Sequence, residues 1–494
     1  MYKYFISDLD GFTKIINIIV FIIFVILSIN SNGYHHPDEH FQIIEFAGLK
    51  AGWNIEEYLT WEYDYKIRPT LQVYIALLII KTALFFHVKN PFFIALILRL
   101  LTALFSIIAI SFFVKSSKHK INKNYYYIFI LLSFFLWFLP SINVRFSSET
   151  WSGLCLLIST ALIQMDKKNK LNYFLIGIFW GLSFEFRFQV ALAIVGFLAW
   201  LVVINKNKLR DFFYIIAGGL VVVGFCTLLD SLFYGQFVFT PFNYFKTNLI
   251  VNPKDLFGTQ PWFFYMISIL NGPTLIIGAS IIISLLITII FDVKNLILWG
   301  IIPFIVIHSI IPHKEVRFLF PLVNFIPIIL MNGFQLITEK KINNEYYLSI
   351  LKSVILAMVI VNFGGLVMMM FKPAGNGSIN IIQHINKEYD KNELLNVYVF
   401  ENNNPFIIGN AKGLKTNFYI PENLQLNYIN DVFLQNIGND KKIVIPKNYY
   451  SEREILENNN YKIEKSGIPN WVMKMNILYR IFNDSSVPLL YTDK

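Results

Sequence analysis

Charged residues and cysteines are both scarce in this sequence. Charged residues account for 15% of the 494 positions, whereas soluble proteins carry roughly 25%. The low charge excludes a single soluble globule, a disordered chain and a coiled coil. The two cysteines, Cys155 and Cys226, both lie in apolar runs, so we interpret them as small core residues and not as a disulfide or a metal pair.

Apolar and aromatic residues fill most of the remaining positions. Hydrophobic residues make up 55% of the chain and aromatic residues 17%, including 48 Phe. A helix that crosses a bilayer needs about 20 mostly apolar residues. The first such run lacks a small-residue cleavage site, so we interpret it as a signal anchor. The sequence predicts an α-helical polytopic membrane protein with about 11 transmembrane helices. The predicted spans are 12–30, 91–114, 125–141, 150–165, 171–186, 188–204, 212–229, 270–291, 296–312, 319–336 and 348–371.

The net charge of +10 does not indicate nucleic-acid binding, because the basic residues lie in short clusters between apolar runs. Excess Lys and Arg in short loops marks the cytoplasmic side of a membrane protein. This rule places the N-terminus inside, the C-terminal region outside, and the loops that carry polar motifs outside as well. The basic loops contain Lys115, Lys118, Lys120 and Lys123; Lys167, Lys168 and Lys170; Lys206, Lys208 and Arg210; Lys294; and Lys340 and Lys341.

Two regions do not fit this alternation of spans. The apolar run 71–88 contains Lys81 and His87, and we interpret it as an interfacial or re-entrant helix at the outer leaflet. Beyond residue 371 the apolar runs shorten to strand length, which predicts a soluble α/β domain at 372–494. The rest, 1–371, is then a transmembrane domain with an outer loop at 31–70. The predicted strands are Asn396–Phe400, Lys442–Pro446 and Tyr461–Glu464.

The first outer segment carries a His-Pro-Asp-Glu motif at 36–39. Pro37 is suited to begin a helix, and Asp38 then lies in the first turn, near the positive end of the helix dipole. Asp38, Gln42 and Glu45 share one helix face. Clustered carboxylates at a membrane surface are costly unless water solvates them. We weigh a general base or cation-handling site equally against a helix cap with a solvated turn.

A metal site in this segment is the weaker hypothesis. His36, Asp38 and His40 offer ligands, and so does His313. The spacing differs from the zinc-protease pattern, in which a Glu follows the first His. We therefore expect neither a metal nor another cofactor.

A second polar cluster, His313–Phe318, lies between two apolar spans. A boundary turn with snorkelling side chains explains one or two of its charges. It does not explain Glu315 flanked by Lys314 and Arg317. A cationic pocket for a phosphate, held by Glu315, explains the whole set, because Arg presents a planar fork of donors.

Several shorter polar segments fall on the same predicted side. Each by itself fits an aromatic interface belt with a turn, but an aromatic surface beside Asn and Gln would also suit a sugar. They are Arg145–Glu149, Phe184–Gln189, Asp230–Gly235, Thr240–Phe245 with Asn243, Asn248, and Phe257–Trp262.

In order and spacing, these motifs resemble the lipid-phosphate-mannose-dependent mannosyltransferases of the GT-C superfamily, glycosyltransferase family 22. The likeness covers residues 36–321, most of the membrane part. It rests on His36–Glu39 with Phe41, Gln42 and Glu45; Thr60–Tyr63 with Ile67 and Arg68; Arg99–Leu101; Phe186 and Arg187; Asp230, Phe233–Gly235, Asn243 and Asn248; Gly258, Pro261 and Trp262; and His313–Glu315 with Arg317, Phe318 and Pro321.

The resemblance implies an inverting transfer of mannose from a polyprenyl phosphate, such as dolichyl phosphate β-D-mannose, to a glycolipid acceptor such as a GPI-anchor precursor. The transmembrane domain would be the catalytic domain of GT-C type. Asp38 would be the catalytic base, with Glu39 assisting. Lys314, Arg317 and Arg187 would stabilise the departing phosphate. The other expected substrate-binding residues are His36, Gln42, Arg68, Asn243 and His313.

Two other classes of function remain open from the residues. A membrane transporter or lipid flippase would also have many spans and charges at span ends, but transport sites usually lie near mid-membrane. A membrane-anchored scaffold would leave the charges at the membrane boundary without a role. An endoplasmic reticulum protein of a eukaryote and an inner-membrane protein of a bacterium would show the same pattern.

Overall fold

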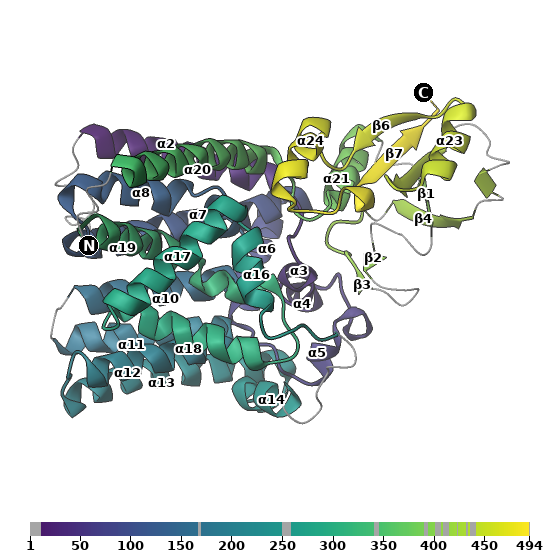
Figure 1. Ribbon diagram of the computed structural model, residues 1–494. Helices are drawn as coiled ribbons and strands as arrows, with labels where there is room; N and C mark the ends of the chain where they lie inside the picture. Colours follow the sequence, from purple (N-terminus) through teal and green to yellow (C-terminus); the bar gives the residue numbers. More distant parts are fainter. Residues whose placement is uncertain are drawn as a thin grey trace. The chain divides into compact units, whose positions relative to one another are not determined.

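Helices make up most of the chain in the computed structural model, and strands occur only toward its C-terminal end among the residues that the structure describes (Figure 1). Those residues are 11–165, 169–248, 258–339, 345–389, 394–400, 407–408, 414–421, 423–430, 433–434 and 441–493. Four residues of the predicted basic loops, Lys167, Lys168, Lys340 and Lys341, and also Phe257, lie outside them.

The chain forms two compact units. The helical unit comprises Met1–Ser28 and Arg99–Met370, and the mixed unit comprises Ile29–Leu98 and Phe371–Lys494. The segment that contains the His-Pro-Asp-Glu motif therefore belongs to the same unit as the C-terminal strands.

Each predicted span overlaps a helix. Among the described residues, four helices are long and apolar enough to cross a membrane, or up to five if the bent pair α17 and α18 counts as one span. The count of about 11 crossings therefore stays a prediction. The helices of this part are α2 (Gly11–Asn30), α7 (Pro91–Ser116), η2 (Lys118–Lys120), η3 (Lys123–Tyr125), α8 (Tyr126–Phe135), α9 (Leu139–Asn143), α10 (Ser148–Gln164), α11 (Lys170–Phe186), η4 (Phe188–Val190), α12 (Ala191–Val203), α13 (Leu209–Tyr234), α14 (Thr240–Lys246), α16 (Phe264–Asn271), α17 (Leu275–Phe291), α18 (Leu296–Ile310), η6 (Val316–Phe325), α19 (Ile326–Glu339) and α20 (Glu345–Phe371).

Glycines let α11 and α13 approach each other closely. A Cβ atom at Gly177 would lie 1.9 Å from the carbonyl oxygen of Ile215, and one at Gly218 would lie 2.2 Å from that of Phe174. Small residues at such contacts are typical of membrane helices, where close backbone approach replaces the hydrophobic driving force. The packing of α11 against α13 fixes the C-terminal end of α11, which leads into Arg187.

A five-stranded sheet lies in the mixed unit, with the strand order β4-β1-β5-β7-β6. Strands β4, β1 and β5 are parallel, and β7 runs antiparallel to both β5 and β6. The predicted strands overlap β1, β5 and β6, and the run 71–88 contains helix α6. The elements of this unit are α3 (Pro37–Phe41), α4 (Ile44–Ala51), η1 (Glu56–Tyr58), α5 (Trp61–Asp64), α6 (Leu71–Phe85), α21 (Ser378–Glu388), β1 (Leu395–Phe400), β2 (Ile407–Ile408), β3 (Leu414–Lys415), β4 (Leu424–Ile429), β5 (Lys442–Pro446), α23 (Tyr450–Asn458), β6 (Lys462–Ser466), α24 (Asn470–Tyr479), η8 (Asp484–Ser486) and β7 (Pro488–Thr492).

Cysteine labelling is expected to place residues 120 and 459 on opposite sides of the membrane. Lys120 lies in a predicted cytoplasmic loop and Asn459 in the predicted outer region, and both are exposed. Because both native cysteines are buried, a membrane-impermeant maleimide should label the native chain poorly. In intact cells or sealed vesicles, Lys120→Cys and Asn459→Cys should react from different sides. Labelling of both from one side would contradict the predicted topology.

Candidate active site

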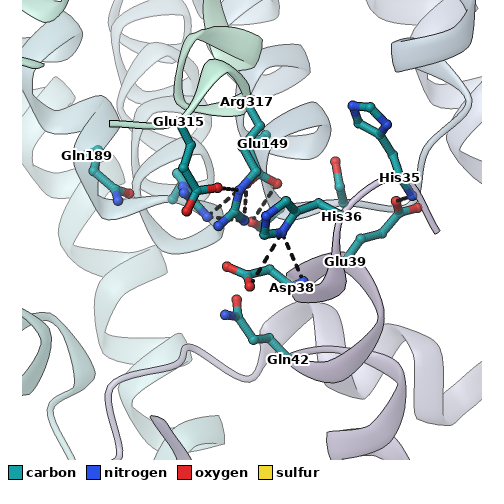
Figure 2. Close-up of polar contacts among 12 residues, drawn as sticks. His35, His36, Asp38, Glu39, Gln42, Glu149, Gln189, Glu315 and Arg317 are labelled. Carbon is teal, nitrogen blue, oxygen red and sulfur yellow. Dashed lines mark hydrogen bonds and ion pairs between the residues drawn. The ribbon is translucent and has the colours of Figure 1, made fainter. Parts of the chain in front are cut away.

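Helix α3 presents Asp38 at its first turn. His36 is the N-cap residue, with extended backbone angles, and Pro37 follows at the position where proline is best tolerated. The Nδ1 atom of His36 accepts the backbone N–H of Asp38 at 3.2 Å and lies 3.6 Å from Asp38 Oδ1 (Figure 2). His36 and Pro37 thus begin the helix, and the same His36 side chain holds the backbone of Asp38.

The two carboxylates of the motif have different surroundings. Glu39 is 8% exposed, and its Oε2 atom accepts the backbone N–H of His35 at 2.9 Å (Figure 2). In a capping box this side chain would accept the N–H of the N-cap residue, His36; here it accepts that of the residue before it. The Asp38 side chain is 22% exposed and makes a longer contact, 3.8 Å, with Arg68 Nη2. Asp38 is therefore the more exposed of the two carboxylates.

Arg68 joins Asp38 to a buried carboxylate, Glu62. Arg68 Nη2 lies 3.1 Å from Glu62 Oε1, and that same oxygen accepts a hydrogen bond from Gln42 Nε2 at 3.0 Å. The predicted residues His36, Gln42 and Arg68 thus surround Asp38 within the mixed unit. Glu62 was part of the family resemblance but not of the predicted site, and it anchors both Gln42 and Arg68.

Three charged residues from distant parts of the sequence meet in the helical unit. Glu149 Oε1 lies 3.0 Å from Arg187 Nη1 and 3.1 Å from Arg317 Nη1, and all three residues are buried. Both guanidinium groups also lie over the ring of Phe318, at 5.2 and 5.4 Å from its centre. Glu315 also contacts Arg317, so two carboxylates balance the two arginines. Each guanidinium group nevertheless has a planar fork of donors, which suits an anionic ligand.

Each member of this cluster lies at the end of a helix. Glu149 is in the first turn of α10, after the N-cap Ser147, where the helix dipole favours a negative charge. Arg187 is the C-cap residue of α11, and Arg317 lies in the first turn of η6. Three helix ends therefore bring the charges to one place, although 168 residues separate Glu149 from Arg317.

The remaining residues of the second polar cluster contact one another and the segment near residue 260. Glu315 Oε2 accepts from Arg317 Nε at 2.5 Å, and its Oε1 lies 3.0 Å from His313 Nε2 (Figure 2). Lys314 donates through Nζ to the carbonyl oxygen of Gln260 at 2.9 Å, and burial lowers the pKa of its ammonium group. Glu315 thus bonds Arg317 and His313, while Lys314 binds backbone carbonyls.

Asn243 lies in the short helix α14. The residue after it, Tyr244, contacts the segment that follows Arg187. Gln189, two residues after Arg187, donates to the hydroxyl of Tyr244 at 2.5 Å. The ring of Phe188 packs on Tyr244 with centres 5.2 Å apart. These contacts place α14 beside the C-terminal end of α11.

The structure brings most of the predicted residues together as two groups. One surrounds Asp38 in the mixed unit, and the other surrounds Glu149 in the helical unit. Glu149 was not among the residues predicted for the site, although it lies in one of the shorter polar segments, Arg145–Glu149. A charge count was the available signal, because Arg187 and Arg317 both require a buried counter-charge.

The sequence matches the profile of the Alg9-like mannosyltransferase family over residues 16–403. The chain belongs to this family. The resemblance inferred from the motifs is therefore confirmed, and the Alg9-like match covers most of the helical unit together with the segment that bears Asp38.

Curated relatives of this Alg9-like chain are mannosyltransferases. Mannosyltransferase APTG1 of Arabidopsis thaliana is 27% identical over 58% of this chain and 52% of its own length. GPI mannosyltransferase 3 of Yarrowia lipolytica is 26% identical over 63% of this chain and 60% of its own length. Alpha-1,2-mannosyltransferase ALG9 of Homo sapiens is 28% identical over 54% and 45%. The chain thus aligns with about half the length of these relatives.

The fold of this Alg9-like protein is similar to that of ArnT. The crystal structure of ArnT from Cupriavidus metallidurans bound to undecaprenyl phosphate superposes with a TM-score of 0.53 at 11% identity, covering 97% of this chain and 98% of ArnT. At that identity the match concerns the fold alone. It supports a mostly helical GT-C fold for the Alg9-like chain.

Proposed function

We propose that this chain is an inverting mannosyltransferase that moves mannose from a polyprenyl phosphate, such as dolichyl phosphate mannose, to a glycolipid acceptor such as a GPI-anchor precursor. Membership of a mannosyltransferase family supports mannose as the sugar that is transferred. The relatives named GPI mannosyltransferase 3 support the acceptor class. The observation that carries the chemistry is the accessible Asp38 carboxylate, held by His36 and Arg68.

Inversion requires a single displacement at the anomeric carbon. An acceptor hydroxyl oxygen forms a bond to C1 of mannose while the bond from C1 to the phosphate oxygen breaks. Asp38 takes the hydroxyl proton, and the lipid monophosphate leaves with the electron pair of the broken bond. Arg68, 3.8 Å from Asp38 Oδ2, orients the Asp38 carboxylate. Glu39 remains bonded to the His35 N–H and shapes the turn.

The phosphate of the donor lipid is the natural ligand for the cluster around Glu149. Arg187 and Arg317 would bind the phosphate before transfer and stabilise the charge that appears on it as the bond breaks. The guanidinium donors of two arginines suit a leaving group that is a phosphate monoester of a lipid. ArnT, which has a similar fold, was crystallised with a related ligand, undecaprenyl phosphate.

The transporter hypothesis gains no support, because the matched family and the named relatives are mannosyltransferases. We propose that 372–494 and loop 31–70 face the lumen of the endoplasmic reticulum in a eukaryote, or the periplasm in a bacterium. The donor lipid presents its sugar at that face, and the predicted positive-inside orientation supports the placement.

The proposed function is tested by incubating the purified full chain with radiolabelled polyprenyl-phosphate mannose and a panel of acceptors. Glycolipids bearing terminal mannose, including GPI-anchor precursors, should become labelled. Free donor phosphate should appear in equal amount. Hydrolysis of the donor without a labelled lipid, or labelling from a nucleotide sugar and not from the lipid donor, would contradict the proposal.

Arg317→Ala is expected to raise the donor KM by roughly 10–100-fold, because a charge-assisted hydrogen bond contributes about 1.5–3 kcal/mol. The rate at saturating donor should fall less. Initial rates over a range of donor concentrations measure both. Arg210→Ala, an exposed arginine in a predicted cytoplasmic loop, is the control and should leave the donor KM unchanged. An unchanged donor KM in Arg317→Ala would contradict phosphate binding by this cluster.

A further inference from the structure

Helix α3, which bears Asp38, ends in an aromatic stack that reaches into the C-terminal part of the mixed unit. The ring of His40 lies 5.1 Å from that of Tyr34 and 5.2 Å from that of Tyr419, and it is nearly parallel to both at 22°. Tyr34 precedes Asp38, and His40 follows it. The stack of Tyr34 on His40 therefore joins the two ends of the short segment that contains Asp38, and Tyr419 also stacks on His40.

A buried carboxylate makes a second connection between the same two segments. Glu45 is 1% exposed. Its Oε1 atom lies 2.8 Å from His40 Nε2 and accepts the backbone N–H of Phe418 at 3.1 Å, while its Oε2 accepts from Asn54 Nδ2 at 3.0 Å. A charge so far from water needs such donors. One of them comes from the backbone more than 370 residues further along the chain.

Neighbouring side chains make further contacts between the outer loop and residues 417–419. Asn417 Nδ2 donates to Asn54 Oδ1 at 3.2 Å, and the ring of Phe418 packs against Trp53 with centres 5.6 Å apart. Tyr419 packs against Phe92 at 5.4 Å. Three consecutive residues, 417–419, thus contact the outer loop and the helix start at Phe92 through hydrogen bonds and ring packing.

We propose that Asn417–Tyr419 is a positioning element for the reaction, and that Tyr419 holds Asp38 in place through His40. An isolated helix of five residues is not stable in water, so α3 depends on its anchors. A reacting group displaced by about 1 Å can lose roughly 100-fold in rate. Tyr419 is a positioning residue because it stacks on His40, which lies two residues from Asp38. The catalytic consequence rests on the proposed function, whereas the structural role does not.

Hydrogen exchange of the full chain tests the structural role directly. The Glu39 N–H bonds the His36 carbonyl, and the Gln42 N–H bonds the Asp38 carbonyl, so both report on α3. Tyr419→Ala should speed exchange at these two amides by about 10-fold or more, since the anchored turn then opens locally. Tyr419→Phe keeps the ring and should exchange like the native protein. Tyr428→Ala, an exposed tyrosine on β4, is the matched control and should also be unchanged.

Two exchange results would overturn the proposal. Native-like exchange of α3 in Tyr419→Ala would mean that the stack does not hold the helix. Faster exchange spread over β5 and β7 as well would mean that Tyr419 serves folding and not positioning.

Transfer assays test the catalytic consequence of the proposal. Tyr419→Ala should lower turnover by roughly 10–100-fold without changing the donor KM, and it should add little to the loss in an Asp38→Asn background. A full additional loss in that background would separate Tyr419 from Asp38 and contradict the role. If the native chain transfers no mannose, the proposed function fails, and the exchange data still decide whether Tyr419 positions α3.

Discussion

Asp38→Asn is expected to lower mannosyl transfer by about 10²–10⁴-fold, the contribution typical of general-base catalysis. The amide has almost the same size as the carboxylate but does not take up a proton at neutral pH. His36 Nδ1 still accepts the backbone N–H of residue 38, so helix α3 should keep its cap. Folding and donor binding should therefore stay close to native. Single-turnover transfer with excess enzyme measures the chemical step separately from acceptor release.

Glu39→Gln is the matched comparison for this prediction. Glu39 is buried and accepts the backbone N–H of His35 through Oε2. A glutamine oxygen can accept the same hydrogen bond, so transfer should fall much less than in Asp38→Asn. An inactive Glu39→Gln beside a near-native Asp38→Asn would assign the base to Glu39. Near-native activity in both would make the motif a helix cap and would refute the proposed mechanism.

Glu149→Ala is expected to destabilise the helical unit by about 3–5 kcal/mol, because it removes a buried carboxylate that contacts two buried guanidinium groups. Transfer should fall with it, since Arg187 and Arg317 would then repel each other and leave the positions proposed for phosphate binding. Thermal unfolding in detergent and the amount of folded protein measure the first effect. Initial rates per folded protein measure the second.

A second substitution separates the two roles of this cluster. In Glu149→Ala with Arg187→Met, one buried charge is removed along with its partner, and Arg317 keeps its bond to Glu315. Stability should recover substantially, whereas donor binding should not, because Arg187 is absent. Recovery of both would show that Arg187 does not bind the donor. A native-like melting temperature in Glu149→Ala alone would contradict the structural role of Glu149.

Local sequence patterns predicted the elements of this protein well. Apolar runs of helix length located a helix in each predicted span, because the pattern that makes a membrane helix is continuous in sequence. Element ends were less accurate where backbone chemistry decides them. The span predicted from residue 270 contains α17, which begins only at Leu275, because Thr274 has a positive φ of 77° and lies outside the helical region.

Local patterns also located the residues around Asp38, because His36, Asp38 and Gln42 lie within one short motif. They did not reveal Glu149 as the partner of two arginines, or Phe418 as a donor to Glu45. These contacts join residues 168 and 373 positions apart. No periodicity in the sequence records such pairs, and tertiary packing alone creates them. Buried charge was the one general indication that distant partners exist.

The most direct measurement is single-turnover transfer from a polyprenyl-phosphate mannose labelled at the anomeric carbon, with the product linkage determined by NMR. We expect an α-linked mannosyl lipid from a β-linked donor, one lipid phosphate released for each mannose transferred, and no measurable product from Asp38→Asn on the same timescale. A β-linked product, or native-like transfer by Asp38→Asn, would contradict the inverting, Asp38-dependent mechanism.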